Sequence, residues 1–145
     1  SNTSPWWFCS RLGNYFISYH YVWHTNVLRQ LMNNLLEKMR KAREISIAVG
    51  DYIFLITRPT DIDAVSMSFD DLKAGVVGVS SFVIGWEGVT ELDLIPGGTA
   101  DSVEFDADLF SEWIKDRPDL WQPLIDGVLD AYKSHRKRQE AQGKP

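Results

Sequence analysis

Apolar residues recur every three to four positions between Thr25 and Arg43, and this spacing predicts an amphipathic helix. Asparagine and basic residues occupy the positions between them. Thr25 or Asn26 can cap the start of the helix, and the basic residues from Lys38 to Arg43 suit the negative end of its dipole. The apolar positions are Val27, Leu28, Leu31, Leu35 and Met39.

Strict alternation replaces the helical period after residue 44 and predicts a β-hairpin. Ile45, Ile47 and Val49 alternate with small residues. Gly50-Asp51 supplies the turn, and the apolar run from Tyr52 to Thr57 forms the returning strand.

Start signals then predict several short helices. Thr60 or Asp61 can cap a helix after Pro59, with Ile62, Val65, Phe69 and Leu72 on one face. Val76, Val79, Val83 and Trp86 keep a helical period, although a run rich in valine fits a strand equally well. A capping box over Thr90–Asp93 predicts a single helical turn, and Pro96-Gly97-Gly98 interrupts the chain.

Two further helices are predicted after this turn. Asp106 is a good cap for a helix over Ala107–Lys115. Pro118 and Pro123 fit only a first helical turn, so the last helix is expected to start there. Its apolar stripe consists of Leu120, Leu124, Val128, Leu129 and Tyr132.

These elements predict a predominantly helical α+β fold. It has an amphipathic N-terminal helix, one β-hairpin, a cluster of short helices and a longer C-terminal helix.

We expect an aromatic-rich arm or extension over residues 1–31, one globular domain over 32–135, and a polar basic tail over 136–145. Residues 1–31 contain eight of the eighteen aromatic residues and no acid. One hypothesis is that the native domain begins near Met32 or Met39. The alternative is an arm that buries its aromatics against a partner or the body.

The net charge of −5 conceals an uneven distribution. Residues 1–43 contain six Lys/Arg and one acid, residues 44–134 five Lys/Arg and eighteen acids, and residues 135–145 four Lys/Arg and one acid. The strongly acidic part of the chain, residues 44–134, repels phosphate backbones, which argues against a nucleic-acid partner. No apolar run reaches the ~20 residues of a membrane-spanning helix, and the single Cys9 allows no internal disulfide. We therefore expect a soluble, intracellular protein without a membrane partner.

Candidate catalytic and metal-binding groups each have a structural explanation. His20 and His24 share the i, i+4 spacing of a metal pair, and Cys9 lies upstream, but a third and a fourth ligand at a recognisable spacing are missing. Ser80-Ser81 lacks the glycine frame of a nucleophile elbow. The glycines at 75, 78 and 85 lack the Lys-Ser/Thr of a phosphate loop. We predict no catalytic, cofactor-binding or metal-binding residue and no cofactor.

Carboxylates are abundant, and most of them stand at predicted helix starts, where they cap the helix and complement its dipole. Acid–base catalysis by a pair of them would require one buried carboxylate with a raised pKa. The carboxylates in question are Asp61, Asp63, Asp70, Asp71, Glu87, Glu91, Asp93, Asp106, Asp108 and Glu112.

Three tryptophans stand out in the body. Core anchoring is the favoured interpretation for at least two of Trp86, Trp113 and Trp121, and the last two are expected to be buried close together. Trp86 lies between two glycines and could instead be exposed on a loop as an interface anchor. We therefore name Trp86, with Trp6 and Trp7 of the arm, as candidate partner-binding residues.

The order of motifs resembles the small tail assembly chaperones of long-tailed bacteriophages and prophages. The resemblance extends over roughly residues 45–135 and leaves the aromatic arm unexplained. Its motifs are structural rather than catalytic. They are the hairpin closing on Thr57-Arg-Pro-Thr60, Val83-Ile-Gly-Trp-Glu-Gly-Val-Thr90, Leu94-Ile-Pro-Gly-Gly98, and Phe105 to Trp121 with its Asp-Arg-Pro-Asp-Leu-Trp corner.

The resemblance implies a largely helical, non-enzymatic protein in the cytoplasm of the bacterial host. Such a protein binds the tape-measure protein while tail-tube subunits polymerise around it, and homo-oligomers are possible. Two alternatives remain open. One is a small structural component of the virion, in the tail or at the head–tail junction. The other is a small enzyme that uses paired carboxylates, which the capping explanation disfavours.

Overall fold

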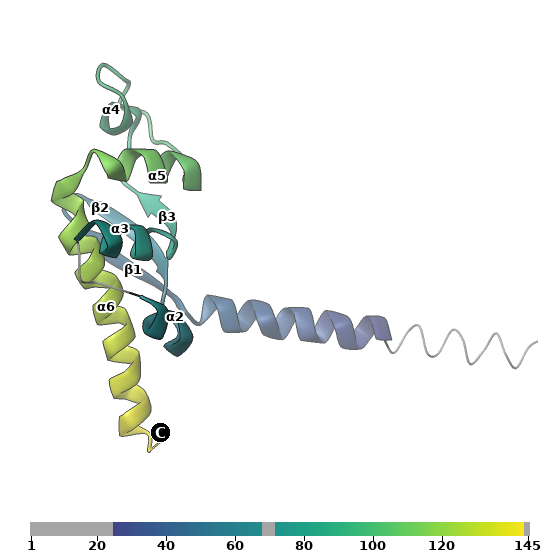
Figure 1. Cartoon of the computed structure of the whole chain (residues 1–145). Coiled ribbons are helices and arrows are strands. Elements are labelled where there is room, and N and C mark those ends of the chain that lie inside the picture. The colour runs from purple at the N-terminus through teal and green to yellow at the C-terminus, as the bar shows by residue number, and fades with distance from the viewer. Residues whose placement is uncertain (1–24, 68–71, 144–145) are drawn as a thin grey trace, which may run out of the picture. The chain divides into compact units, whose positions relative to one another are not determined.

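The computed structural model describes residues 25–67 and 72–143, and it divides the chain into two compact units, residues 1–42 and 43–145 (Figure 1). In the first unit, residues 25–41 form one helix, as the apolar period predicts. Every residue of this helix is exposed. The boundary between the two units lies after residue 42, just past the end of this helix.

The second unit is built on a three-stranded antiparallel sheet in the order β1-β2-β3. The predicted hairpin is confirmed as β1 (Glu44–Val49) and β2 (Tyr52–Thr57). Gly50, with a φ of 60°, makes the turn between them, a conformation that favours glycine.

The third strand corrects the helical interpretation of residues 76–86. α3 (Leu72–Ser80) contains only the first part of that run, and β3 (Val83–Glu87) contains Val83 and Trp86. The strand forms because β-branched and aromatic side chains fit a pleated surface and because β2 offers a free edge. Trp86 lies opposite Phe54 in the register.

Start signals locate the remaining helices correctly. Thr60 and Asp63 form a capping box for α2 (Asp61–Ser66), and Thr90 and Asp93 form one for α4 (Glu91–Leu94). Asp106 caps α5 (Ala107–Lys115) through the backbone N–H groups of residues 108 and 109. The expected apolar face of α2 is not buried, since Ile62 is 80% exposed and Val65 89% exposed. Phe69, of the same face, lies outside the described residues.

α6 (Pro118–Ala141) is longer than predicted. Pro118 stands in its first turn as expected, but Pro123 lies inside the helix. The residues predicted to form a polar basic tail from 136 onward continue the helix to Ala141. Long basic side chains at a helix C-terminus favour this continuation because they complement the dipole.

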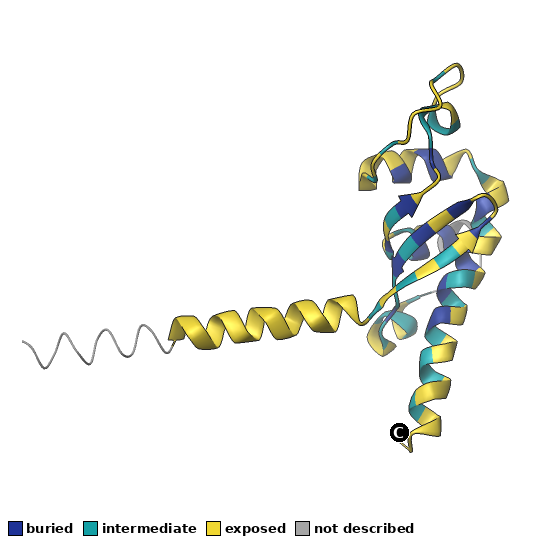
Figure 2. Ribbon diagram, turned by 180° about the vertical axis from the view of Figure 1, so that it is seen from behind, coloured by how far each residue is buried: buried dark blue, intermediate teal, exposed yellow. Residues whose placement is uncertain are grey.

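The core lies between one face of the sheet and the helices α3, α5 and α6. Figure 2 shows the other side, with the strands in front of α6 and exposed residues along them. Gly127 of α6 allows close approach to β1, because a Cβ there would lie 2.8 Å from Cδ1 of Ile47. The fold is the predicted α+β class, predominantly helical and with a longer C-terminal helix.

Candidate functional site

A polar network around Asp93 joins the hairpin to α4 and α5. The hydroxyl of Tyr52 donates to Oδ1 of Asp93 over 2.7 Å, and the backbone N–H and hydroxyl of Thr90 both donate to Oδ2 over 2.8 Å. The indole N–H of Trp113 donates to the Asp93 carbonyl oxygen over 2.8 Å. Burial favours a higher pKa for Asp93, but these donors outweigh it, and its pKa lies below the ordinary value.

Arg117 extends this network to the start of α6. Its Nε and Nη2 donate to the two carboxylate oxygens of Asp119 over 3.0 and 2.9 Å, and its Nη1 donates to the Tyr52 hydroxyl over 3.3 Å. The guanidinium lies 5.4 Å from the Tyr52 ring centroid and 5.1 Å from that of Trp113, within cation–π range. The carboxylate of Asp119 raises the pKa of Arg117, and Arg117 lowers the pKa of Asp119.

This network has the properties of a structural clamp. A general base or acid needs a pKa near the working pH and room for a reacting group beside it. The pKa of Asp93 moves away from neutrality, and both of its carboxylate oxygens already accept hydrogen bonds. The network therefore fixes Tyr52 and Trp113 in place.

Asp63 and Glu91 also accept hydrogen bonds from nearby threonines. The Thr60 hydroxyl and backbone N–H donate to Asp63 over 2.7 and 2.8 Å, and they lower the pKa of Asp63. The backbone N–H and hydroxyl of Thr99 donate to Glu91, each over 2.8 Å, and lower its pKa. The prediction that carboxylates serve as caps is confirmed for Asp63, Asp93 and Asp106.

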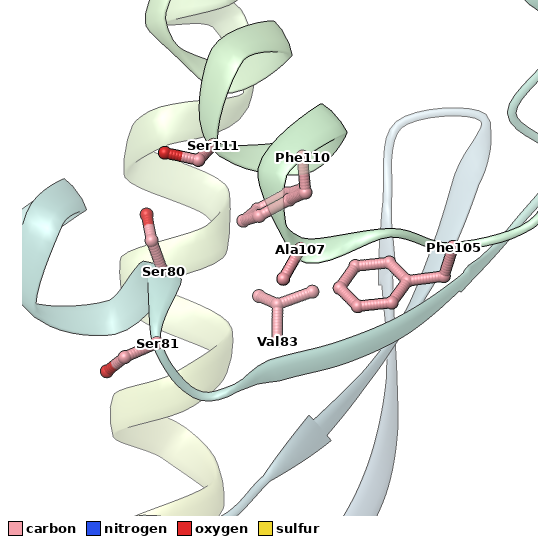
Figure 3. Close-up of a pocket in the computed structure, with 7 residues that line it drawn as sticks. All are labelled: Ser80, Ser81, Val83, Phe105, Ala107, Phe110 and Ser111. Carbon is pink, nitrogen blue, oxygen red and sulfur yellow. The ribbon is translucent and has the colours of Figure 1, made fainter.

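One pocket opens between the end of α3 and the start of α5 (Figure 3). It encloses about 210 Å³. Two of its hydroxyls are engaged locally, since Ser80 donates to the Val76 carbonyl oxygen over 2.5 Å and Ser81 to that of Gly78 over 3.2 Å. None of the seven lining residues can act as a base toward these hydroxyls. They are Ser80, Ser81, Val83, Phe105, Ala107, Phe110 and Ser111.

The helix over 25–41 carries a second candidate site, an exposed apolar surface. The helix over 25–41 exposes between 37% and 64% of each of its seven large apolar side chains. A single exposed apolar residue is ordinary, but a continuous stripe of this length marks an interaction surface. The seven residues are Val27, Leu28, Leu31, Met32, Leu35, Leu36 and Met39.

The candidate partner-binding residues have different outcomes. Trp86 is only 9% exposed, and its indole N–H donates to the Val103 carbonyl oxygen over 2.7 Å. It therefore anchors the core, and its interpretation as an exposed anchor on a loop is wrong. Trp6 and Trp7 lie outside the described residues, as do Cys9, His20 and His24.

The other tryptophans agree in part with expectation. Trp113 is buried, and its ring meets those of Tyr52 and Trp86 edge-on, with centroids 5.3 and 5.7 Å apart. Trp121 is only partly buried, and its indole N–H donates to the Ile114 carbonyl oxygen over 2.6 Å. The prediction of burial is therefore confirmed for Trp113 and only in part for Trp121.

No protein-family model, curated protein or solved structure matches this chain. Within residues 25–67 and 72–143, no helix combines the length and apolar character that crossing a membrane requires. The same described residues contain no cluster of three or more His, Cys, Asp or Glu side chains arranged around a metal-sized site.

Proposed function

We propose that this protein is an assembly chaperone of the bacteriophage tail. In this proposal it binds the tape-measure protein, tail-tube subunits or both during tail morphogenesis, in the cytoplasm of the bacterial host. It acts by holding a helical partner and catalyses no reaction. Two features support this function. They are the resemblance of the motifs to those of tail assembly chaperones and the exposed apolar stripe of the helix over 25–41.

The observation that carries the proposal is the apolar stripe of the helix over 25–41. Leu28, Met32, Leu35 and Met39 are spaced by four, three and four residues, the spacing of the seam between two paired helices. All four are between 48% and 64% exposed. A second helix that covered this seam would remove it from water, which is the usual way in which one helix recognises another.

The polar groups of the second unit support a binding role over a catalytic one. Asp63 and Asp93 have lowered pKa values and accept hydrogen bonds from neighbouring threonines. The pocket between α3 and α5 has hydroxyls and aromatic rings but no titratable side chain among its lining residues.

The test is co-expression of the tagged full chain with the candidate tape-measure protein and, separately, with tail-tube subunits, followed by pull-down. The variant is Leu35→Lys, which places a charge in the middle of the exposed seam. Val77→Lys is the matched control, since Val77 is also exposed, at 69%, but lies on α3. We expect Leu35→Lys to lower the recovered partner about tenfold and Val77→Lys to leave it unchanged.

Two results would contradict the chaperone function. One is the absence of a complex with either partner when both are soluble and co-expressed. The other is assembly of normal tails by phage that lack this gene. If the complex forms equally well with wild type and with Leu35→Lys, the chaperone function stands, but the binding surface does not lie on this helix.

A further inference from the structure

The outer face of the sheet, opposite the core, is defined by the strand register. Ile53 and Leu55 of β2 alternate with the buried Tyr52, Phe54 and Ile56. Their partners in the register therefore lie on the outer face as well. These partners are Ala48 and Glu87 for Ile53, and Ser46 and Gly85 for Leu55.

The centre of this outer face is apolar. An antiparallel sheet with one face in water usually carries polar side chains on that face. Here Ile53 is 42% exposed, and Leu55 is the next residue of β2 on the same face. Ala48 of β1, which pairs with Ile53, is exposed as well. The alternation that buries one face of β2 thus leaves isoleucine and leucine on the other.

A bulge enlarges the apolar area. Leu55 pairs with Gly85 and Ile56 pairs with Val83, so Ile84 is the additional residue of β3, and it is 40% exposed. A Cβ at position 85 would lie 3.2 Å from Cβ of Leu55, so glycine there leaves room for the leucine side chain. Bulges are frequent at sheet edges, where they can re-aim a side chain.

The charges on the outer face have one sign. Glu44 stands opposite Thr57 at one end and Glu87 opposite Ile53 at the other, and both glutamates are exposed. None of the seventeen strand residues is Lys or Arg. A ligand with an apolar centre and basic flanks complements this surface in both polarity and charge.

We infer that the outer face of the sheet is the docking surface for an amphipathic helix of a partner protein, one whose apolar stripe is flanked by Lys and Arg. The helix lies across Ala48, Ile53, Leu55 and Ile84 and places its basic side chains against Glu44 and Glu87. This inference rests on the proposed function, because it assigns a second surface and a charge pattern to the helical partner.

The test uses the full chain with methyl-labelled isoleucine and two synthetic peptides. Both peptides have 18 residues and a leucine stripe at helical spacing, one with lysine and the other with glutamate at the remaining positions. We expect the Leu/Lys peptide to bind about tenfold more tightly than the Leu/Glu peptide. It should shift the NMR signals of the Ile53 and Ile84 methyl groups and leave those of Ile62 in α2 unchanged.

A charge-matched pair of variants separates docking from general attraction to an acidic protein. Glu44→Lys/Glu87→Lys should reverse the preference toward the Leu/Glu peptide. Asp126→Lys/Asp130→Lys changes the net charge equally on the exposed side of α6 and should preserve the preference for Leu/Lys. The inference would be overturned if both double variants lost the preference for the Leu/Lys peptide to the same extent. It would also be overturned if the peptide shifted the methyl signals of Ile62 but not those of Ile53.

The titration also separates this inference from the proposed function. It requires no phage protein, so the peptide can fail to bind the sheet while the tape-measure complex still forms. Conversely, the peptide can bind the outer face as described even if the co-expressed phage proteins are not recovered. Each result therefore bears on one proposal alone.

Discussion

The hydroxyl of Tyr52, the first residue of β2, donates a 2.7 Å hydrogen bond to the carboxylate of Asp93 in α4. The two residues are 41 positions apart in the sequence. Asp93 also caps its own helix through Thr90, so one carboxylate holds both the start of α4 and the end of the hairpin turn. The loop after β3 is thereby tied to the core through a polar contact.

Removing the Tyr52 hydroxyl should destabilise the protein. We expect Tyr52→Phe to lower the free energy of unfolding by about 0.5–1.5 kcal/mol, because Asp93 and Arg117 each lose a partly buried partner. Urea denaturation measures this change. Tyr132→Phe is the control, since that hydroxyl also donates to a carboxylate, Asp61, but on the surface. A cost for Tyr132→Phe as large as that for Tyr52→Phe would contradict the structural role of the network.

Stability should fall in acid because of the lowered carboxyl pKa values. Hydrogen bonds hold the pKa values of Asp63 and Asp93 in the folded state below the ordinary 3.8. Below that value the unfolded chain therefore binds more protons than the folded one. The stabilisation is complete above 3.8 and is lost as the pH falls through the folded-state values.

Urea midpoints measured at a series of pH values down to about 2 test this expectation. Asp93→Asn should give a shallower loss of stability in acid than the wild type, because one of the linked carboxylates is gone. Asp126→Asn, at a surface position of α6, is the control and should keep the wild-type slope. The same steep loss in Asp93→Asn and wild type would show that Asp93 does not contribute.

Local signals in the sequence located most helix starts. The capping boxes at Thr60 and Thr90 lie within four residues of chain, so both could be predicted without knowledge of the fold. The partners of Asp93 could not, because Tyr52 and Trp113 approach it only after the sheet and α5 are in place.

β3 illustrates why a period can mislead. Val83 and Trp86 are three positions apart, which fits one face of a helix, but in β3 they face the core on either side of a bulge. The glycines at positions 85 and 88 are also typical of an exposed loop. Gly85 instead leaves room for Leu55, and Gly88 has a φ of 84° at the end of the strand. Both requirements come from tertiary contacts and turn geometry that the local pattern does not encode.

The two tryptophans at the α5–α6 corner should differ in their energetic contribution. Trp113→Ala should cost about 3–5 kcal/mol, because the ring is buried against Tyr52 and Trp86. Trp121→Ala should cost less, about 1–3 kcal/mol, because its ring is only partly buried. Chemical denaturation of both variants gives the comparison. A larger loss of stability for Trp121→Ala would mean that packing at the α5–α6 corner matters more for stability than the contacts of Trp113 with Tyr52 and Trp86.

The second unit should fold without the first. Its buried core residues all lie between Val49 and Ala131, and the helix over 25–41 contributes none of them. We expect a chain that starts at Met39 to melt cooperatively, with a free energy of unfolding within about 1 kcal/mol of the full chain. A chain that starts at Gly50 is the control, since it lacks β1 and the core contacts of Ile45, Ile47 and Val49, and it should not melt cooperatively. Circular dichroism and calorimetry distinguish the two, and loss of the cooperative transition in the Met39 chain would show that residues 1–38 are part of the folding unit.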